Sequence, residues 1–458
     1  MQENKMGVMP VKKLIISMSV PMMISMLVQA LYNIVDSVFV ARLGEEALTA
    51  VTLVFPLQQL MIAVGTGTGV GVNALLSRSL GEKKTNVSDK SANMALLLSF
   101  FNFLLFLLLG MTIVKPFISS QTESSVTRAF GIDYGTIVCC FSFGIFFQIM
   151  LERLLQSTGR TVLSMASQLT GAIINTILDP LLIFGLLGFP KLGIAGAAYA
   201  TVIGQTIAAV TGFVLNIKYN KEIHFSFGSV IRPDIKIIGR IYSVGLPSIL
   251  MVSISSVMTY SMNMILKTFS DTATAVFGSY FKLQSFVFMP VFGLNNGTIP
   301  VLAYNLGARK KERIDETLKF AIKLAVSIML AGLLIFELIP GVLLSFFDAS
   351  DYMLSIGIPA LRIIAIHFPI AGVSIVLISL FQAFSKSVYS FIVSICRQLV
   401  VLIPAAYLLS LTGNVSNVWW SFPMAELVSL ILTMTFFRRV YRSTFPPEEN
   451  ANEKSAEK

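Results

Sequence analysis

Charged residues are scarce in this sequence: Asp, Glu, Lys and Arg make up 13% of its 458 residues, against about 25% in soluble globular proteins. Histidine occurs twice and cysteine three times, and the cysteines all lie within apolar runs. The sequence therefore has no disulfide framework and no Cys/His metal-ligand spacing. It also has no nucleophile–base pair inside the apolar runs, which argues against a membrane-embedded enzyme. The 55% hydrophobic content indicates a polytopic membrane protein. No cofactor is expected.

Twelve apolar runs are long enough to cross a bilayer as helices, for which about 20 residues are needed. They are too long, and alternate too little, to be spanning strands. The predicted fold class is therefore an all-α polytopic membrane protein with twelve transmembrane helices. The approximate spans are 14–40, 50–77, 91–114, 131–155, 161–185, 196–217, 239–266, 274–300, 320–345, 355–382, 388–411 and 417–437.

Lysine and arginine concentrate in alternate connections between the spans. They cluster before the first span, after the second, between the sixth and seventh, after the eighth and after the twelfth, and they are sparse in the other connections. By the positive-inside rule, both termini are predicted to be cytoplasmic, in the inner (plasma) membrane. Because these basic segments are short and lie between apolar runs, the formal net charge of +10 does not indicate a nucleic-acid partner.

The second half of the sequence repeats the first half in a single register, which aligns Pro21 with Pro247. The same register aligns Gln58 with Gln284, Gly71 with Gly297, and "SLGEKK" at 79–84 with "NLGARK" at 305–310. We call this register the repeat, and it predicts two six-helix lobes. Six is an even number, so both lobes insert in the same orientation, related by a pseudo-twofold axis along the membrane normal, with the solute path between them. The predicted parts are a cytoplasmic N-terminal segment 1–13, an N-lobe 14–217, an inter-lobe loop 218–238, a C-lobe 239–440 and a cytoplasmic tail 441–458.

An acid stands inside the first span. Asp36 lies about 33 Å along the helix, at a rise of about 1.5 Å per residue, and a carboxylate at such a depth is by default a functional-site hypothesis. The alternative is a polar residue at the outer interface, near Arg42. Its counterpart in the repeat is Met262, so only the N-lobe carries this acid. Earlier in the same span, Pro21 is expected to free the carbonyl of Ser17 or to bend the helix.

The fifth span contains "INTILDPLLIFG". Asn175 and Asp179 are four residues apart and therefore share one helix face. Pro180 follows and disrupts the backbone bond to the carbonyl of Thr176. Amide, carboxylate and carbonyl oxygens suit a hard cation such as Na⁺, and the same group could instead carry a proton. The alternative is a static proline kink with a polar face.

Other polar residues within the spans are weaker candidates. Glu152 and Arg153 are adjacent at the end of a span and are expected to reach the interface, and His367 is expected to be a packing residue. The glycine-rich stretch "VGTGTGVGVN" lacks the Lys-Ser/Thr of a P-loop and is expected to allow close helix packing or to form a flexible segment. Five residues remain as weak candidates for lining a substrate cavity: Gln58, Gln284, Lys282, Arg397 and Glu426.

Taken together, these features resemble the multidrug and toxic compound extrusion (MATE) transporters, from about residue 14 to residue 440. The matching motifs are "YNIVDSVFVARLG" in the first span, "LGEKK" after the second, "LQSTGRT" after the fourth, "NTILDPLLIFG" in the fifth, "LGIAGAAYATVIGQ" leading into the sixth and "CRQLVVLIP" in the eleventh. The first-lobe acids are similar to those of the DinF-like and MepA-like branch of the family.

The resemblance implies an exporter of amphiphilic, cationic organic compounds, driven by antiport of H⁺ or Na⁺. Nothing in the sequence suggests an obligate partner, so a monomer is expected. By that similarity, the cation-coupling site consists of Asp36, Asn175, Asp179 and Thr201, with Tyr32 close by. Pro21 is then the bend point of the first helix. The spans 239–266 and 355–382 contain no carboxylate, so a second-lobe cation site of the NorM-like kind is not expected.

Two further functions stay open from the sequence. One is a lipid-linked oligosaccharide flippase of the same superfamily, which would need several basic residues lining the cavity. Here only Lys282 and Arg397 qualify. The other is a channel, against which the internal repeat and the paired intramembrane acids argue.

Overall fold

The computed structural model describes residues 4–347 and 349–446, and this part of the chain contains helices and connecting turns but no strand. Ten helices are long and apolar enough to cross a membrane, and two bent helix pairs raise the number of spans to as many as twelve. Each predicted span falls on one of these helices or pairs. The predicted all-α polytopic membrane fold is therefore confirmed.

The first half of the chain supplies six spans and three short helices. The spans are α2 (Val11–Ala41), α3 (Glu45–Gly81), α4 (Thr85–Thr112), the bent pair α6 (Ser125–Cys140) and α7 (Phe143–Ser157), α8 (Thr161–Phe184) and α9 (Ile194–Tyr219). The short helices are α1 (Lys5–Val8), α5 (Val114–Ser119) and the 3₁₀ turn η1 (Leu186–Gly188).

The second half follows the same order, after the connecting helix α10 (Phe227–Ile231). Its spans are α11 (Ile235–Lys267), α12 (Asp271–Gly307), α13 (Lys311–Leu338), the bent pair α15 (Asp351–Ala365) and α16 (Phe368–Ala383), the run α17 (Ser387–Ile395), η2 (Cys396–Leu402) and α18 (Ile403–Ser410), and α20 (Ser421–Thr444) preceded by α19 (Val415–Val418). A short α14 (Pro340–Ser345) precedes the bent pair.

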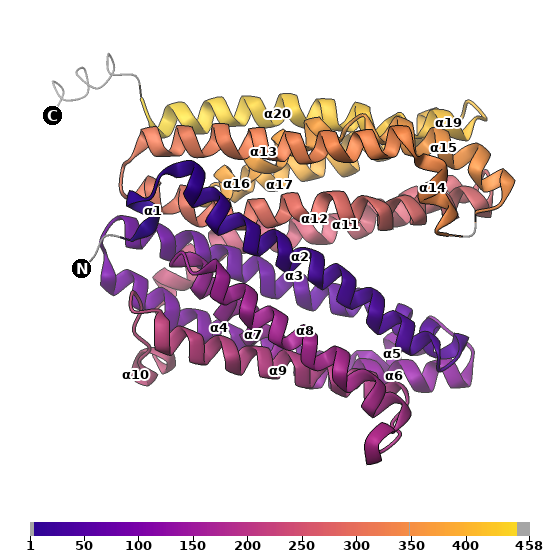
Figure 1. Cartoon of the computed structure of the whole chain (residues 1–458), viewed down its shortest axis with the longest axis horizontal. Coiled ribbons are helices and arrows are strands. Elements are labelled where there is room, and N and C mark those ends of the chain that lie inside the picture. Colours follow the sequence, from indigo (N-terminus) through magenta and orange to yellow (C-terminus); the bar gives the residue numbers. More distant parts are fainter. Residues whose placement is uncertain (1–3, 348, 447–458) are drawn as a thin grey trace.

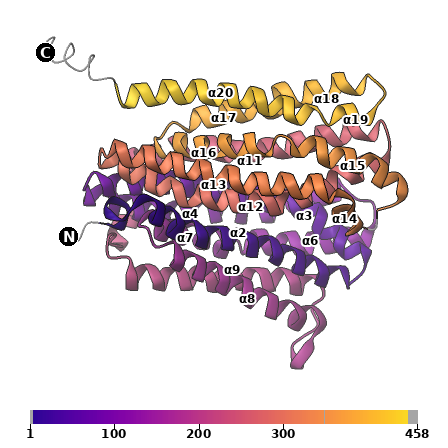
Figure 2. The ribbon, with the colours of Figure 1, turned by 45° about the horizontal axis from the view of Figure 1, so that its top comes forward.

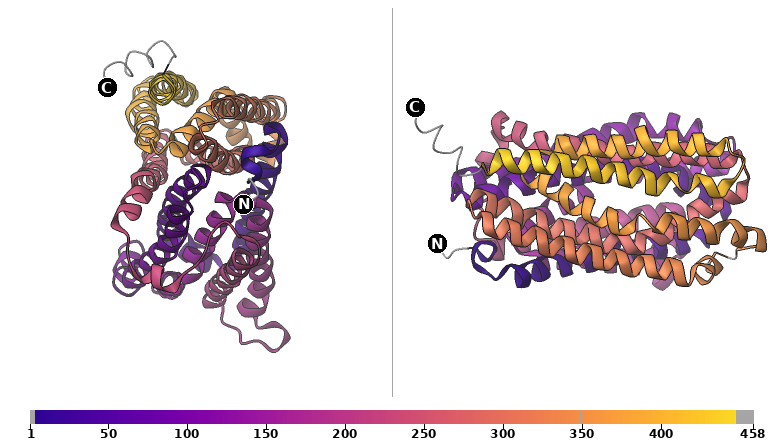
Figure 3. Two further views of the ribbon diagram at one scale, coloured as in Figure 1. Left: turned by 90° about the vertical axis from the view of Figure 1, so that its left-hand side faces the viewer. Right: turned by 90° about the horizontal axis from the view of Figure 1, so that it is seen from above.

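The helices form two bundles that meet at one end and separate toward the other (Figure 1). We call the bundle of α2–α9 the N-lobe and the bundle of α11–α20 the C-lobe. Viewed along the helices, the two lobes are distinct groups (Figure 3, left). Where they meet, α2 packs along α12 and α3 packs along α11 (Figure 2). We call the end near α1 the closed end and the end near α5 and α14 the open end.

The backbone follows the repeat closely. The bounds of α3, α4 and α5 recur, in the register of the repeat, as those of α12, α13 and α14. The two broken spans bend at corresponding places, by 45° and 46°. Even the turn conformation recurs, since Lys83 has φ 58° and Arg309 has φ 56°. These left-handed residues follow the ends of α3 and α12, where a glycine is the usual choice.

Glycines on both sides of the axis allow the closed end to pack. A Cβ on Gly81 would lie 2.0 Å from the carbonyl oxygen of Tyr304, and a Cβ on Gly307 would lie 2.2 Å from that of Arg78. The repeat relates these two contacts to each other. Gly71, in the glycine-rich stretch, would meet the carbonyl of Ile241 on α11 at 2.2 Å. The stretch therefore serves close helix packing, as the sequence predicted.

The two prolines that the sequence predicts as bend points lie inside continuous helices, Pro21 in α2 and Pro180 in α8. The ring of Pro21 leaves the Ser17 carbonyl without its usual helical donor. The hydroxyl of Thr161 replaces that donor, from the first residue of α8, at 3.2 Å. The proline in the first span is therefore coupled to the start of the fifth span by a hydrogen bond.

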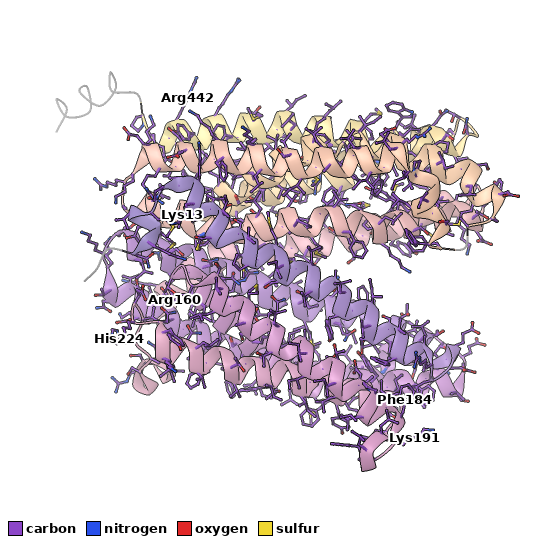
Figure 4. The ribbon with its side chains drawn as sticks, viewed as in Figure 1. Lys13, Arg160, Phe184, Lys191, His224 and Arg442 are labelled. Atoms are coloured by element: carbon purple, nitrogen blue, oxygen red, sulfur yellow. The ribbon has the colours of Figure 1, made fainter. Side chains whose placement is uncertain are left out.

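Several basic side chains gather at the closed end. The labelled basic side chains Lys13, Arg160 and Arg442 lie at the closed end, together with His224 (Figure 4). Phe184 lies toward the open end, near Lys191 (Figure 4). Ion pairs also join segments at the closed end, among them Lys90 with Asp234 at 3.1 Å.

Candidate functional site

Two acids from different helices meet inside the N-lobe. Asp36 lies on α2 and Asp179 on α8, and these helices pack along each other. Asp179 is fully buried and Asp36 is half-buried, and the charges of the two carboxylates act on each other. The sequence predicts which helix carries each acid, but only the packing of α2 against α8 brings the two acids together.

Three further polar side chains surround these acids. Asn175 lies one turn before Asp179 on α8, and its Nδ2 donates a hydrogen bond to Thr201 Oγ1 of α9 at 3.3 Å. Tyr32 lies one turn before Asp36 on α2 and interacts with Thr201. All five residues of the predicted coupling site therefore lie together, and we call them the N-lobe cluster.

The N-lobe cluster holds more acceptor oxygens than donors. Within the described residues, Oδ1 of Asp36, Oδ1 of Asn175 and both carboxylate oxygens of Asp179 are buried without a hydrogen-bond partner. An unpartnered buried polar atom costs about 1–3 kcal/mol, and more when it is charged. A cation or a proton among these oxygens would remove that cost. The atoms available to bind a cation are all oxygens, which fits Na⁺ as a ligand. The same oxygens also fit protonation of one carboxylate.

The cluster adjoins a cavity in the N-lobe. The cavity has an empty volume of about 1330 Å³, part of it open to solvent, and Tyr32, Asn175 and Thr201 all lie on its wall. Gln58, a predicted cavity residue, lines it as well and donates a hydrogen bond to the Tyr134 hydroxyl at 3.2 Å. A solute in this cavity would therefore lie directly beside the cluster.

The prediction that Glu152 and Arg153 reach the membrane interface is wrong. Their exposed fractions are 8% and 7%, and both side chains line the N-lobe cavity. Gln148 donates a hydrogen bond to Glu152 at 3.0 Å. The sequence placed the two residues near a helix end, but α7 begins only at Phe143, after the bend, and packs against α3 and α9. This packing keeps their side chains inside the lobe.

Arg153 also links the two lobes. Its Nη1 donates to Gln156 Oε1 at 2.9 Å and to Asn296 Oδ1 of α12 at 3.0 Å. Arg153 passes close to α3, because a Cβ on Gly69 would lie 2.7 Å from its Cγ. The guanidinium therefore joins the wall of the N-lobe cavity to a helix of the C-lobe.

A second cavity lies within the C-lobe, with an empty volume of about 1230 Å³. Three of the predicted cavity residues line it: Gln284, Arg397 and Glu426. Arg397 Nη1 lies 3.3 Å from Glu426 Oε2, which makes them an ion pair. The sequence predicts each of these residues separately, and the pairing of Arg397 in η2 with Glu426 in α20 follows only from the packing of the two helices.

Two other candidates lie elsewhere. Lys282 is exposed, lies over the ring of Phe347 at 5.8 Å and does not line either of the two cavities. His367 is buried, as predicted for a packing residue, and its ring stacks on that of Phe422. It also lies on the wall of the C-lobe cavity, a position that a lone histidine in the sequence did not indicate.

Comparison with known families gives a match to the MatE family. The match covers residues 21–181 and 247–408, which are one region in each lobe. The first region begins at Pro21 and the second at Pro247, its counterpart in the repeat, so the family match itself contains the repeat.

The chain is similar to curated transporters over nearly its whole length. It is 26% identical over 424 residues to the multidrug export protein MepA of Staphylococcus haemolyticus (strain JCSC1435), covering 92% of each chain. It is 25% identical over 436 residues to an FAD transporter of Shewanella oneidensis, covering 94% of this chain and 95% of that protein.

A solved structure has a similar arrangement of helices. It is the outward-facing conformation of a multidrug resistance MATE family transporter of the MOP superfamily, with a TM-score of 0.90 and 26% sequence identity. The similarity covers 96% of this chain and 98% of that chain. The lobes of this protein, which meet at one end only, are arranged as in that structure.

Proposed function

Because the chain belongs to the MatE family of multidrug and toxic compound extrusion transporters, we propose that it exports organic compounds from the cell in exchange for H⁺ or Na⁺. It is a multi-pass membrane transporter and not an enzyme. The observation that carries the antiport proposal is the N-lobe cluster, which adjoins a cavity and holds four buried oxygens without a hydrogen-bond partner among the described residues.

The coupling mechanism begins with two like charges. Asp36 and Asp179 act on each other in a buried setting, where both carboxylates are costly to keep charged. Na⁺ among the oxygens of Asp36, Asn175 and Asp179, or a proton on one carboxylate, offsets that cost. Thr201 orients the amide of Asn175 by accepting a hydrogen bond from it, and Thr201 also interacts with the hydroxyl of Tyr32. Cation and solute then compete by favouring different conformations of one lobe.

The moving part in this proposal is α2. It carries Asp36 and Tyr32 on one half and Pro21 on the other, and it packs against both α8 and α12. Binding of a cation in the cluster would change how α2 packs on α8, with Pro21 as the bend point. The hydrogen bond from Thr161 to the Ser17 carbonyl keeps that point attached to α8. A bend there would alter the wall of the N-lobe cavity without unfolding either helix.

In the membrane, we place the closed end in the cytoplasm and the open end outside. The support is the gathering of basic side chains at the closed end, Lys13, Arg160 and Arg442 among them, and the positive-inside rule. Both termini then lie in the cytoplasm, and the two cavities are accessible from outside. The resting assembly is a monomer in this proposal.

The substrates are proposed to be amphiphilic organic compounds, including cations. The N-lobe cavity combines apolar walls, such as Met26 and Phe55, with the acid Glu152. The relatives named as a multidrug export protein and as an FAD transporter handle organic solutes. The flippase alternative is not favoured, because it would need several basic residues lining the cavity. Each of the two cavities is lined by one arginine, Arg153 or Arg397, and Lys282 lies outside both.

The test is dye transport by purified protein in proteoliposomes. Rhodamine 6G efflux is measured under an imposed pH gradient or an imposed Na⁺ gradient, for the wild type, Asp36→Asn and Asp179→Asn. The wild type responds to one gradient, which identifies the coupling ion, and both variants lose that response. Asp133→Asn is the matched control, because Asp133 is an exposed aspartate on α6 outside the cluster. A full gradient response in both cluster variants would refute the coupling site, and no response in the wild type would refute antiport.

A further inference from the structure

The C-lobe cavity differs in chemical character from the N-lobe cluster, because it combines aromatic walls with an ion pair. Its wall is rich in aromatic side chains, namely Tyr280, Phe281, Phe288, Phe292 and Phe422. Three methionines add adaptable apolar surface: Met251, Met258 and Met289. Among this apolar surface stands one cation, Arg397. Flat aromatic solutes are the class that such walls bind, and the charge selects among them.

Arg397 reaches the cavity through an irregular stretch of helix. It lies in η2, where the helix takes a π-helical turn, whereas the corresponding helix of the N-lobe, α8, is regular. Such turns are frequent at functional sites, since they redirect the side chains that follow. The repeat places Gly171 at the position of Arg397 and Ala200 at that of Glu426. The charged pair is therefore an addition of the C-lobe and not part of the shared fold.

Within the described residues, the guanidinium of Arg397 uses only some of its N–H groups as hydrogen-bond donors. It makes one hydrogen bond, from Nη1 to Glu426 Oε2 at 3.3 Å, which is long for a charge-assisted bond. The Arg397 side chain is 25% exposed, whereas that of Glu426 is 4% exposed. A guanidinium has five N–H donors. The other N–H groups of Arg397 make no hydrogen bond within the described residues, and both Arg397 and Glu426 line the cavity.

We propose that the C-lobe cavity binds aromatic or heteroaromatic acids, with the acid group on Arg397 and the rings against Phe281, Phe288 and Phe422. A carboxylate or phosphate can accept two parallel hydrogen bonds from the guanidinium fork. Glu426 then acts as the internal counterion that holds Arg397 in place and competes with the ligand for its donors. This inference rests on the proposed function, because it names a substrate class for the exporter.

The experiment compares two dyes with one xanthene ring system and opposite charge. Fluorescein is the anionic probe and rhodamine 6G the cationic probe, and binding is followed by fluorescence anisotropy with the protein in phosphatidylcholine nanodiscs and no ion gradient. The main variant is Arg397→Gln/Glu426→Gln, which removes both charges and so leaves no unpaired buried carboxylate. Lys282→Gln is the matched control, because it removes a cation from the same lobe outside the cavity.

The wild type is expected to bind fluorescein, and the double variant at least about tenfold more weakly, in line with the loss of charge-assisted hydrogen bonds. Rhodamine 6G binding changes less than twofold in the double variant, and fluorescein binding changes less than twofold in Lys282→Gln. Glu426→Gln alone is expected to tighten fluorescein binding several-fold, because it releases Arg397. A purely structural ion pair would not give that gain.

Fluorescein binding that is unchanged in the double variant, or that weakens in Glu426→Gln, would overturn the inference. So would an equal loss of both dyes. Because this assay uses no gradient, its failure leaves the antiport proposal untouched if proteoliposome transport of rhodamine 6G still follows the gradient. Conversely, fluorescein binding with the expected pattern stands even if that transport shows no gradient dependence.

Discussion

The N-lobe and the C-lobe share a backbone but not a chemistry. The N-lobe places acids and an amide where the C-lobe has apolar residues: Asp36 corresponds to Met262, Asn175 to Val401, Asp179 to Ala405 and Thr201 to Leu427. Met262 is fully buried in the C-lobe core. In place of an acidic cluster, the C-lobe has an ion pair in an aromatic cavity.

The difference shows how a duplicated fold divides two tasks. Two neighbouring carboxylates in a buried site are costly until a cation or proton joins them, so such a site responds to ions. In the C-lobe, Arg397 compensates the charge of Glu426 through Oε2, although Oε1 of Glu426 is buried without a hydrogen-bond partner within the described residues. This carboxylate therefore depends less on an added cation than the two neighbouring acids of the N-lobe do. The shared backbone provides two movable halves, and the side chains decide which half handles ions. Four predictions test what the lobes share and where they differ, in order of decreasing effect.

The largest effect is expected from removing the N-lobe acids. Asp179→Asn should abolish the response of transport to the coupling gradient, because the cluster loses the charge that recruits the cation. Glu426→Gln changes how solutes bind but should keep the ratio of transport with and without the gradient. Dye transport in proteoliposomes, measured with and without the gradient, gives this ratio for each of the two variants. If Glu426→Gln also lost the gradient response, the division between the lobes would be wrong.

The next effect concerns a feature that the lobes share. Gly81→Ala and Gly307→Ala each place a Cβ against backbone, 2.0 Å and 2.2 Å from a carbonyl oxygen of the other lobe. Each should destabilise the protein by about 1–3 kcal/mol, the usual cost of overpacking. Thermal unfolding of the purified variants measures this, and the two losses should be similar. Gly278→Ala is the control, because its Cβ would meet nothing within 4 Å.

A smaller effect should come from the contact between Arg153 and Asn296, which has no counterpart in the other half of the repeat. Asn296→Ala removes the acceptor that joins Arg153 to the C-lobe, and the repeat has Val70 and Ser379 at the two corresponding positions. A hydrogen bond to a charged group contributes about 1.5–3 kcal/mol, so the closed end should open more often.

Spin labels on His224→Cys and Arg442→Cys, in a background without native cysteines, measure this opening as a longer distance between the lobes. Asn417→Ala removes an amide from the C-lobe away from the lobe contact and should leave the distances as they are. Identical distance distributions in Asn296→Ala and the parent protein would exclude Arg153 as a tie between the lobes.

The smallest effect is a pH dependence at the closed end. Hydrogen bonds from Lys90 and from the backbone N–H of Ile237 lower the pKa of Asp234 below its ordinary value of 3.8. The stability from this group is present above that ordinary value and is lost as the pH falls through the lowered pKa. Asp234→Asn should therefore unfold at a slightly lower temperature than wild type near neutral pH.

That difference should vanish in acid, where the wild-type carboxyl is protonated as well. Asp133→Asn, which removes an exposed acid without such a partner, should show no difference at either pH. A gap between wild type and Asp234→Asn that widens as the pH falls would contradict this sign. The corresponding residues in the repeat, Val8 and Glu316, form no such pair.

The sequence predicted most of the fold and part of the site. The first span was expected at 14–40 and lies at Val11–Ala41, since length and hydropathy fix where a chain can cross a bilayer. The bend between α6 and α7 was not foreseen. It occurs at Phe141 and Ser142, neither of which is a proline or a glycine. The bend before α16 has a clearer signal, Pro369, in the first turn of that helix.

The errors and omissions share one cause. Glu152 and Arg153 were placed by their distance from a helix end, but α7 follows a bend and packs inside the lobe. The pairing of Arg397 with Glu426 joins residues 29 positions apart on different helices. The contact of Arg153 with Asn296 joins residues 143 positions apart. No local pattern of residue types carries such information.

By itself, the sequence determined the number of spans, the repeat and the identity of the intramembrane polar residues. Each of these depends on local quantities: apolar length, side-chain charge and spacing along one helix. The tertiary structure decided which polar residues meet, because helix packing sets the distance between Asp36 and Asp179 and the burial of Glu152. It also decided that the acidic cluster adjoins a cavity of the N-lobe, whereas Arg397 and Glu426 line a separate cavity of the C-lobe.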